Sequence, residues 1–147
     1  MAPWRDTVPD QTQTELDGLL NAVLPFAKEM LSEYGEFFPY GAGLAADGYV
    51  TLVAGDPGTG EQPEAADVLA VLYSTLWARS DEFVATAAVS DVRLQEPDTS
   101  AIRVELEHRD GPAIGVLIAY EVDLENAAVT TGEVRGVSGD RRTWPAP

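Results

Sequence analysis

The sequence contains no cysteine and only one histidine among its 147 residues. Without cysteine the chain can form no disulfide and offers no thiolate nucleophile, so redox chemistry through thiols is excluded. Because His108 is the only histidine, one chain cannot build a two-histidine metal site, which excludes the commonest zinc enzymes. We therefore expect no metal and no cofactor, and no motif identifies a catalytic residue.

Basic residues are also scarce, since nine Lys and Arg stand against 25 Asp and Glu for a formal net charge of −16. Nucleic acids and anionic membranes are bound through basic residues, so we expect neither as a partner. The same charge would attract a basic protein and accelerate the encounter, although it also serves solubility. A basic protein is therefore the partner that the composition favours.

Long apolar runs are missing too. The longest apolar segment, residues 112–120, is far shorter than the roughly 20 residues that span a bilayer. No basic stretch followed by an apolar run marks a secretory signal near Met1. Together with the absence of cysteine, this predicts a cytoplasmic location.

The apolar content of 45% is enough to bury a core, and the length fits a single domain over residues 1–147. We expect the core to span about residues 12–137, with residues 1–11 and 138–147 as tails. Apolar residues at spacings of three and four between Leu16 and Tyr34 predict an amphipathic helix that ends at Gly35. Pro25 interrupts this stripe and predicts either a kink or two abutting helices.

Asp47-Gly48 between two apolar runs, residues 37–44 and 49–54, predicts a β-hairpin. A second helix is expected to begin at Pro63, because proline suits the first turn of a helix. Its expected buried face consists of Ala65, Val68, Leu69, Leu72 and Leu76, with Trp77 as a candidate for the same face.

After residue 81 the apolar period changes to two, which predicts strands at about 83–94, 101–109, 113–122 and 129–137. In the second of these, Ile102 to His108 and Arg103 to Arg109 alternate between a core face and a solvent face. A three-residue loop at 110–112 would place Ile114 opposite His108. The predicted fold is α+β, with a mainly antiparallel sheet in the order α-β-β-α-β-β-β(-β) and the helices packed on one face.

The candidate site residues are a histidine, two tyrosines and a carboxylate. His108 has the phase of the core, where a neutral imidazole can hydrogen-bond a buried group. Alternatively, a pocket between helices and sheet could bring together Glu36, Tyr40, His108 and Tyr120. On the opposite face we expect Glu105 and Glu107 to be solvated and paired with neighbouring arginines rather than to form a catalytic pair.

Two residue patterns resemble known proteins. The first, Glu36-x-Phe38-Pro39-Tyr40-Gly41-Ala42-x-Leu44-x-x-Asp47-Gly48 with Glu107-His108-Arg109-Asp110-Gly111 and Tyr120, resembles a group of small uncharacterised bacterial proteins over roughly residues 15–122. This resemblance implies no activity. The part from Gly41 to Gly48 also resembles the opening of cytidine deaminases, but no His/Cys-x-Glu or Cys-x-x-Cys follows, which excludes a zinc deaminase.

The predicted order of elements is similar to that of roadblock and profilin-like modules, which act as dimeric scaffolds for regulators such as small GTPases. A homodimer is therefore a further possibility. Our leading hypothesis is a non-enzymatic acidic protein-binding module, either an adaptor or an immunity-type inhibitor of a basic partner. The alternative is a small-ligand-binding protein or small enzyme with its pocket between helices and sheet.

Overall fold

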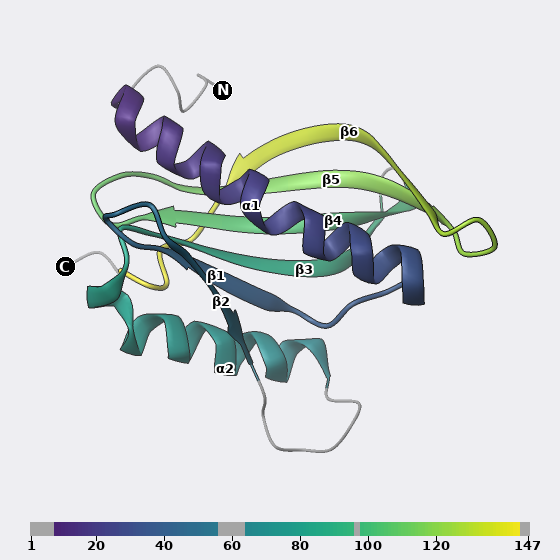
Figure 1. Ribbon diagram of the computed structural model, residues 1–147, viewed down its shortest axis with the longest axis horizontal. Coiled ribbons are helices and arrows are strands. Elements are labelled where there is room, and N and C mark those ends of the chain that lie inside the picture. Colours follow the sequence, from purple (N-terminus) through teal and green to yellow (C-terminus); the bar gives the residue numbers. More distant parts are fainter. Residues whose placement is uncertain (1–7, 56–63, 96–97, 145–147) are drawn as a thin grey trace.

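The computed structural model describes residues 8–55, 64–95 and 98–144. Within them, six strands form one sheet in the order β2-β1-β3-β4-β5-β6, with every neighbouring pair antiparallel (Figure 1). The elements are α1 (Asp10–Tyr34), β1 (Tyr40–Leu44), β2 (Val50–Ala54), α2 (Ala65–Ala78), the short 3-10 helix η2 (Ser80–Glu82), β3 (Ala85–Gln95), β4 (Asp98–His108), β5 (Ala113–Asp123) and β6 (Ala128–Ser138). The α+β class and the predicted order of elements are confirmed. Pro63 and the outer parts of both expected tails lie outside the described residues.

Helix α1 forms as its apolar spacing predicts. Its buried stripe includes Leu16, Leu19, Val23 and Leu31, which pack on β1, β3, β4 and β5. Pro25 lies inside this single helix, so the alternative of two abutting helices is wrong. The helix ends as predicted at Gly35, whose left-handed conformation (φ 76°) lets its N–H reach the Leu31 carbonyl.

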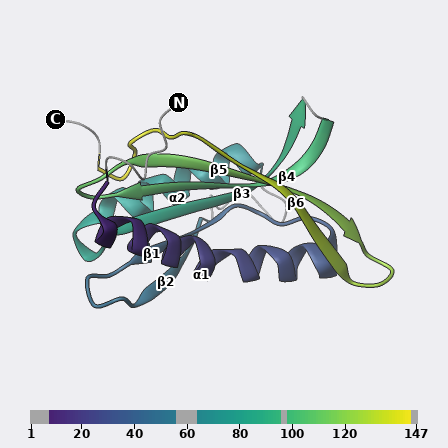
Figure 2. The same ribbon diagram turned by 90° about the horizontal axis from the view of Figure 1, so that it is seen from above.

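The two helices lie on opposite faces of the sheet, which corrects the prediction that both share one face (Figure 2). Helix α2 forms a second, smaller core with Val53, Phe83 and Ala88 on the face turned away from α1. Its buried residues are Val68, Leu72 and Leu76, whereas Trp77 is 60% exposed and does not join them. Strand β1 and the first six residues of β3, 85–90, are consequently buried on both sides.

Glycine in β1 explains why the second face was missed. Gly41 and Gly43 face the second core, and a Cβ at Gly41 would lie 2.8 Å from Leu72 Cδ1 of α2. A Cβ at Gly43 would overlap the ring of Phe83. Glycine has no side chain that would mark a position as buried. The apolar pattern of β1 therefore predicts a strand with one buried face.

The β4–β5 hairpin has the predicted loop length but a different register. The His108 N–H donates to the Pro112 carbonyl, so the three loop residues are 109–111 and Ile114 lies opposite Leu106. The prediction that Ile114 faces His108 is therefore wrong by two residues. Such a shift keeps the same side chains on the core face, so hydrophobic alternation alone could not detect it.

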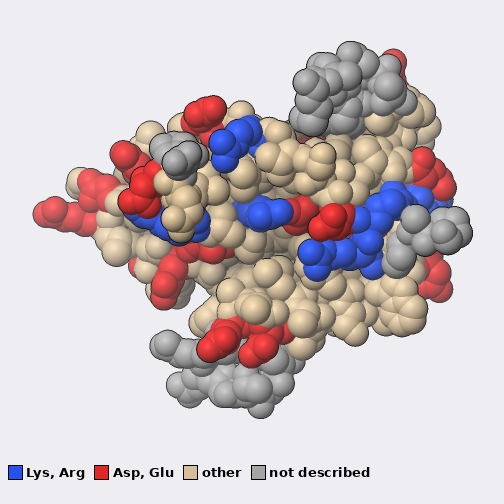
Figure 3. All heavy atoms as spheres, turned by 180° about the vertical axis from the view of Figure 1, so that it is seen from behind, with Lys and Arg blue, Asp and Glu red and all other residues tan. Residues whose placement is uncertain are grey.

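The charges are unevenly distributed over the surface. Lys and Arg gather on the face seen in Figure 3, which is turned away from α1, and Asp and Glu are interspersed among them. Most of the described arginines pair locally, as in the ion pairs Arg79–Glu82, Arg93–Asp98 and Arg103–Glu105. No helix of the described residues has the length and hydropathy needed to cross a bilayer.

A glycine-to-alanine pair tests the packing of Phe83 on β1. Gly43→Ala should lower the free energy of unfolding by about 1–3 kcal/mol, because the added methyl group overlaps Phe83. Gly18→Ala, where nothing lies within 4 Å of the new Cβ, should instead raise it by about 0.5–1 kcal/mol. Urea unfolding measures both. Equal stabilities for the parent and Gly43→Ala would contradict the close approach of β1 and Phe83.

Candidate functional site

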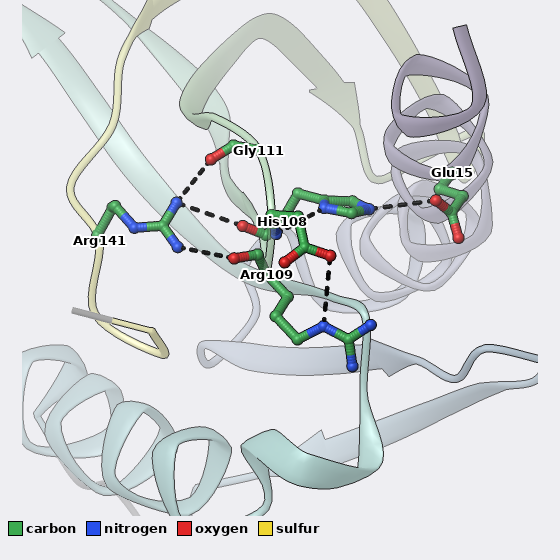
Figure 4. A network of polar contacts seen from close by, with 6 residues as sticks. Glu15, His108, Arg109, Gly111 and Arg141 are labelled. Atoms are coloured by element: carbon green, nitrogen blue, oxygen red, sulfur yellow. Dashed lines mark hydrogen bonds and ion pairs between the residues drawn. The ribbon is translucent and has the colours of Figure 1, made fainter. Parts of the chain in front are cut away.

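His108 is buried at the end of β4, where it connects the β4–β5 loop to α1 (Figure 4). Its Nδ1 accepts the N–H of Asp110 at 3.1 Å. In the neutral imidazole the proton therefore lies on Nε2, which is 3.1 Å from the Glu15 carboxylate of α1. Both ring nitrogens are thus used in holding the loop and the helix together, as the structural interpretation of His108 predicts.

The segment after β6 is fixed to the same end of the sheet, although residues 138–147 were expected to form a tail. The Arg141 guanidinium donates to the backbone carbonyls of His108, Arg109 and Gly111 (Figure 4). It also donates to the carbonyl of Trp144 at 2.8 Å. One arginine therefore links the β4–β5 loop to the C-terminal segment.

Glu107 is buried, which corrects the prediction of a solvated carboxylate. Its Oε1 accepts the N–H groups of Arg142 and Thr143, both at 2.9 Å, and its Oε2 accepts that of Trp144 at 2.7 Å. Three successive backbone donors compensate the charge of this carboxylate in the interior. Glu105 follows the prediction instead, because its carboxylate pairs with Arg103.

A cleft of about 760 Å³ lies at the other end of the sheet. Its walls come from the last turns of α1, the segment that leads into β1, the start of α2 and the middle of β3. The residues that line it are Phe26, Met30, Tyr34, Glu36, Phe37, Phe38, Pro39, Tyr40, Ala65 and Asp91. The cleft thus combines five aromatic side chains with two carboxylates, and none of the described residues that line it is basic.

Tyr40 forms the base of this cleft. Its ring meets Phe26 edge to face at 4.7 Å and Phe37 at 5.8 Å between centroids. Its hydroxyl donates to the Val23 carbonyl at 2.5 Å. Burial raises the pKa of this hydroxyl well above its usual value, so Tyr40 remains a neutral donor at any physiological pH.

Asp91 brings a carboxylate into the cleft from β3. Its Oδ1 accepts the hydroxyl of Tyr120 at 2.5 Å. Burial, the largest cause, and the nearby charge of Glu36 raise the pKa of Asp91, while the hydrogen bonds from Tyr120 and from the Phe37 backbone oppose this rise. Burial likewise raises the pKa of Tyr120, so the proton of this short bond stays on the tyrosine.

Three of the four residues of the predicted pocket therefore gather at one end, and the fourth does not. Glu36 and Tyr40 line the cleft, and Tyr120 reaches it through Asp91. His108 pairs with Ala85 at the start of β3, whereas Asp91 lies six residues further along that strand. The structure thus separates His108 from the cleft by the length of the sheet.

Asp91 was missed by the sequence analysis although the sequence contains a signal for it. It continues the alternation of Ala85, Ala87 and Val89, all of which are buried against α1. A carboxylate at a core position of a strand requires a hydrogen-bonding partner or a functional reason. The apolar lining contributed by Phe26, Met30 and Tyr34 carried no comparable signal, because these residues resemble part of the core stripe of a helix.

In residues 8–55, 64–95 and 98–144, no three His, Asp or Glu side chains are arranged so that they could hold a metal ion. Comparisons of the chain with protein-family models, with curated proteins and with solved structures found no match. The geometry of the described residues is therefore the basis for a functional proposal.

Replacement of Glu107 tests its role at the end of the sheet. Glu107→Gln should lower the free energy of unfolding by about 2–3 kcal/mol, because an amide group faces three backbone donors and can accept from only one side. Glu105→Gln, two residues earlier on the same face, should cost less than about 1 kcal/mol. Urea unfolding of the two variants gives the comparison. Equal losses would show that residues 142–144 are not held by Glu107.

The raised pKa of Asp91 predicts a specific dependence of stability on pH. The raised pKa means that the folded protein binds this proton more tightly than the unfolded chain does. The contribution of Asp91 to stability is therefore greatest below the unfolded pKa, near 3.9, and is lost as the pH rises through the folded pKa. Asp91→Asn cannot ionise, so its stability relative to the parent should increase across this interval and then level off.

The measurement is urea unfolding of the parent and Asp91→Asn at a series of pH values between about 3 and about 7, spanning the ordinary range of the carboxyl. Tyr120→Phe serves as a second variant, because removal of its hydrogen bond should raise the pKa of Asp91 further. A stability difference that does not change with pH would contradict a raised pKa.

Proposed function

We propose that this chain is a non-enzymatic binding module that presents one acidic end to a basic protein. The proposal is supported by the position of carboxylates near the C-terminal end of α1. We call this group the acidic end and define it as Glu29, Glu33, Glu121, Asp123 and Glu125. Its members come from α1 and from the β5–β6 hairpin, which lie side by side in both ribbon views (Figures 1 and 2).

The close approach of the β5–β6 hairpin to the end of α1 supports this arrangement. A Cβ at Gly35, the residue that ends α1, would lie 3.3 Å from Leu124 Cδ1 at the tip of the hairpin. Leu124 is 56% exposed and Tyr34 is 65% exposed, so apolar surface lies among the carboxylates. Protein interfaces commonly combine an apolar centre with a polar rim. The acidic end has both parts.

The charge around the acidic end is not compensated by ion pairs in the described part of the chain. The ion pairs of that part involve none of its five carboxylates. The cations of these pairs are Arg79, Arg93, Arg103, Arg109 and Arg142, each with another acidic partner. A field from uncompensated like charges accelerates association with an oppositely charged protein. The acidic end is therefore the surface at which we expect a basic partner to arrive.

The position of His108 argues against the enzymatic alternative. Its ring nitrogens are both engaged at the far end of the sheet, so the cleft lacks the residue that would most readily transfer a proton near neutral pH. A homodimer stays a prediction, and strands β2 and β6, the edges of the sheet, are the elements that could pair with a second copy.

Charge reversal at matched positions tests the proposal. Glu29→Lys with Glu33→Lys should lower the association rate with a lysine-rich peptide by about tenfold or more and weaken its dependence on salt. Asp81→Lys with Asp110→Lys changes the net charge equally at the opposite end of the sheet and should have a clearly smaller effect. Stopped-flow binding at low and high salt gives the rates, and capture from a lysate of the source organism would then identify the native partner.

Equal effects of the two double variants would show that only net charge matters, and the acidic end would lose its assigned role. A rate independent of salt for the parent would contradict the electrostatic basis of the proposal.

A further inference from the structure

We propose that the cleft at the C-terminal end of α1 binds a small organic cation, consisting of an apolar or aromatic body that carries a protonated amine. This inference does not depend on the basic protein partner. The cleft uses the carboxylates of Glu36 and Asp91, neither of which belongs to the acidic end. The two proposals can therefore fail separately.

The size of the cleft indicates the size of its ligand. At about 760 Å³ it falls within the range of pockets that hold small molecules, roughly 300–1,000 Å³, and exceeds what one amino-acid side chain would fill. Its lining is mainly aromatic, with a few polar groups that can fix orientation. Both properties favour a small molecule with a substantial apolar part.

The walls of the cleft include aromatic rings that remain accessible. Phe38 is 52% exposed and Phe26 is 37% exposed, although large aromatic side chains are normally buried where the core can accept them. Tyr40 and Phe37 pack against each other behind them, which fixes the position of the wall. Exposed ring faces held on a rigid base attract ammonium groups through the quadrupole of the ring.

The charge of the cleft selects the sign of the ligand. Among the described residues that line it, Glu36 and Asp91 carry the only charges, and their negative charges act on each other. Asp91 is also partly removed from water, so its ionised form is penalised both by burial and by Glu36. A cation placed between the two carboxylates would offset both penalties, whereas an anion would increase them.

A metal ion suits this arrangement less well than an organic cation. Calcium and magnesium take six or more oxygen ligands, and the cleft supplies two carboxylates between apolar walls. One oxygen of Asp91 is already bonded to Tyr120. The remaining carboxylate oxygens can accept from an ammonium group, while the aromatic walls cover the apolar body of the ligand.

Three probes of similar shape and different charge test the proposal. They are 3-phenylpropylamine, which is cationic at neutral pH, 3-phenylpropan-1-ol, which is neutral, and 3-phenylpropionate, which is anionic. We expect the amine to shift the NMR amide resonances of residues 34–38, 40 and 91, with an affinity about tenfold or more above that of the alcohol. The propionate should give no shifts at these positions.

Variants of the full chain separate a specific site from a general charge effect. Glu36→Gln should weaken binding of the amine by about tenfold and leave binding of the alcohol unchanged. Glu33→Gln, which removes the same charge from α1 outside the cleft, should leave both unchanged. Phe38→Ala should weaken both probes, because it removes an aromatic wall, and near-parent stability in urea would confirm that the variant is folded.

Three outcomes would overturn the proposal. They are the absence of shifts with the amine, equal affinities for the amine and the alcohol, and equal losses of amine binding in Glu36→Gln and Glu33→Gln. Each of these outcomes leaves the charge-reversal test of the acidic end unaffected, because that test changes Glu29 and Glu33 rather than the lining of the cleft.

Discussion

The hydroxyl of Tyr40 donates to the Val23 carbonyl, and this buried bond joins the first strand of the sheet to the middle of α1. It lies close to Pro25, which cannot donate a backbone N–H and so weakens the helix at this point. The same Tyr40 ring is the base of the cleft, where it contacts Phe26 and Phe37. Because one side chain fixes both the helix and the cleft wall, the shape of the cleft is determined by the packing of the core.

The chain is strongly acidic, and three of its carboxylates point inward, each with its own hydrogen-bonding partners. Glu107 accepts three backbone N–H groups, Glu15 faces the imidazole of His108, and Asp91 accepts the hydroxyl of Tyr120. Each arrangement meets the requirement that a charge removed from water be hydrogen-bonded or paired. Glu107 and Glu15 lie at the end of the sheet that carries the β4–β5 loop. Of the three, Asp91 is the one that lies beside the cleft.

Periodicity was sufficient to predict the helices and strands, because apolar side chains at spacings of two or about 3.6 define their buried faces. It was not sufficient to place α2, because Gly41 and Gly43 leave no apolar trace on the second face of β1. Of the four residues predicted for the candidate site, Glu36 and Tyr40 line the cleft, Tyr120 bonds to Asp91 in its lining, and His108 lies at the other end of the sheet. Asp91 itself was not predicted. The burial of Glu107 depends on the backbone of Arg142, Thr143 and Trp144, which follow it by 35 to 37 positions. Local sequence patterns do not report contacts at that distance.

The same separation has a consequence for the order of folding. Strands β3 and β4 are neighbours in sequence and can pair before residues 142–144 reach Glu107. Until those residues dock, water must solvate the Glu107 carboxylate, because a buried charge without hydrogen-bond donors is strongly disfavoured. The sheet therefore closes at this end only after a segment that contributes no strand of its own has docked.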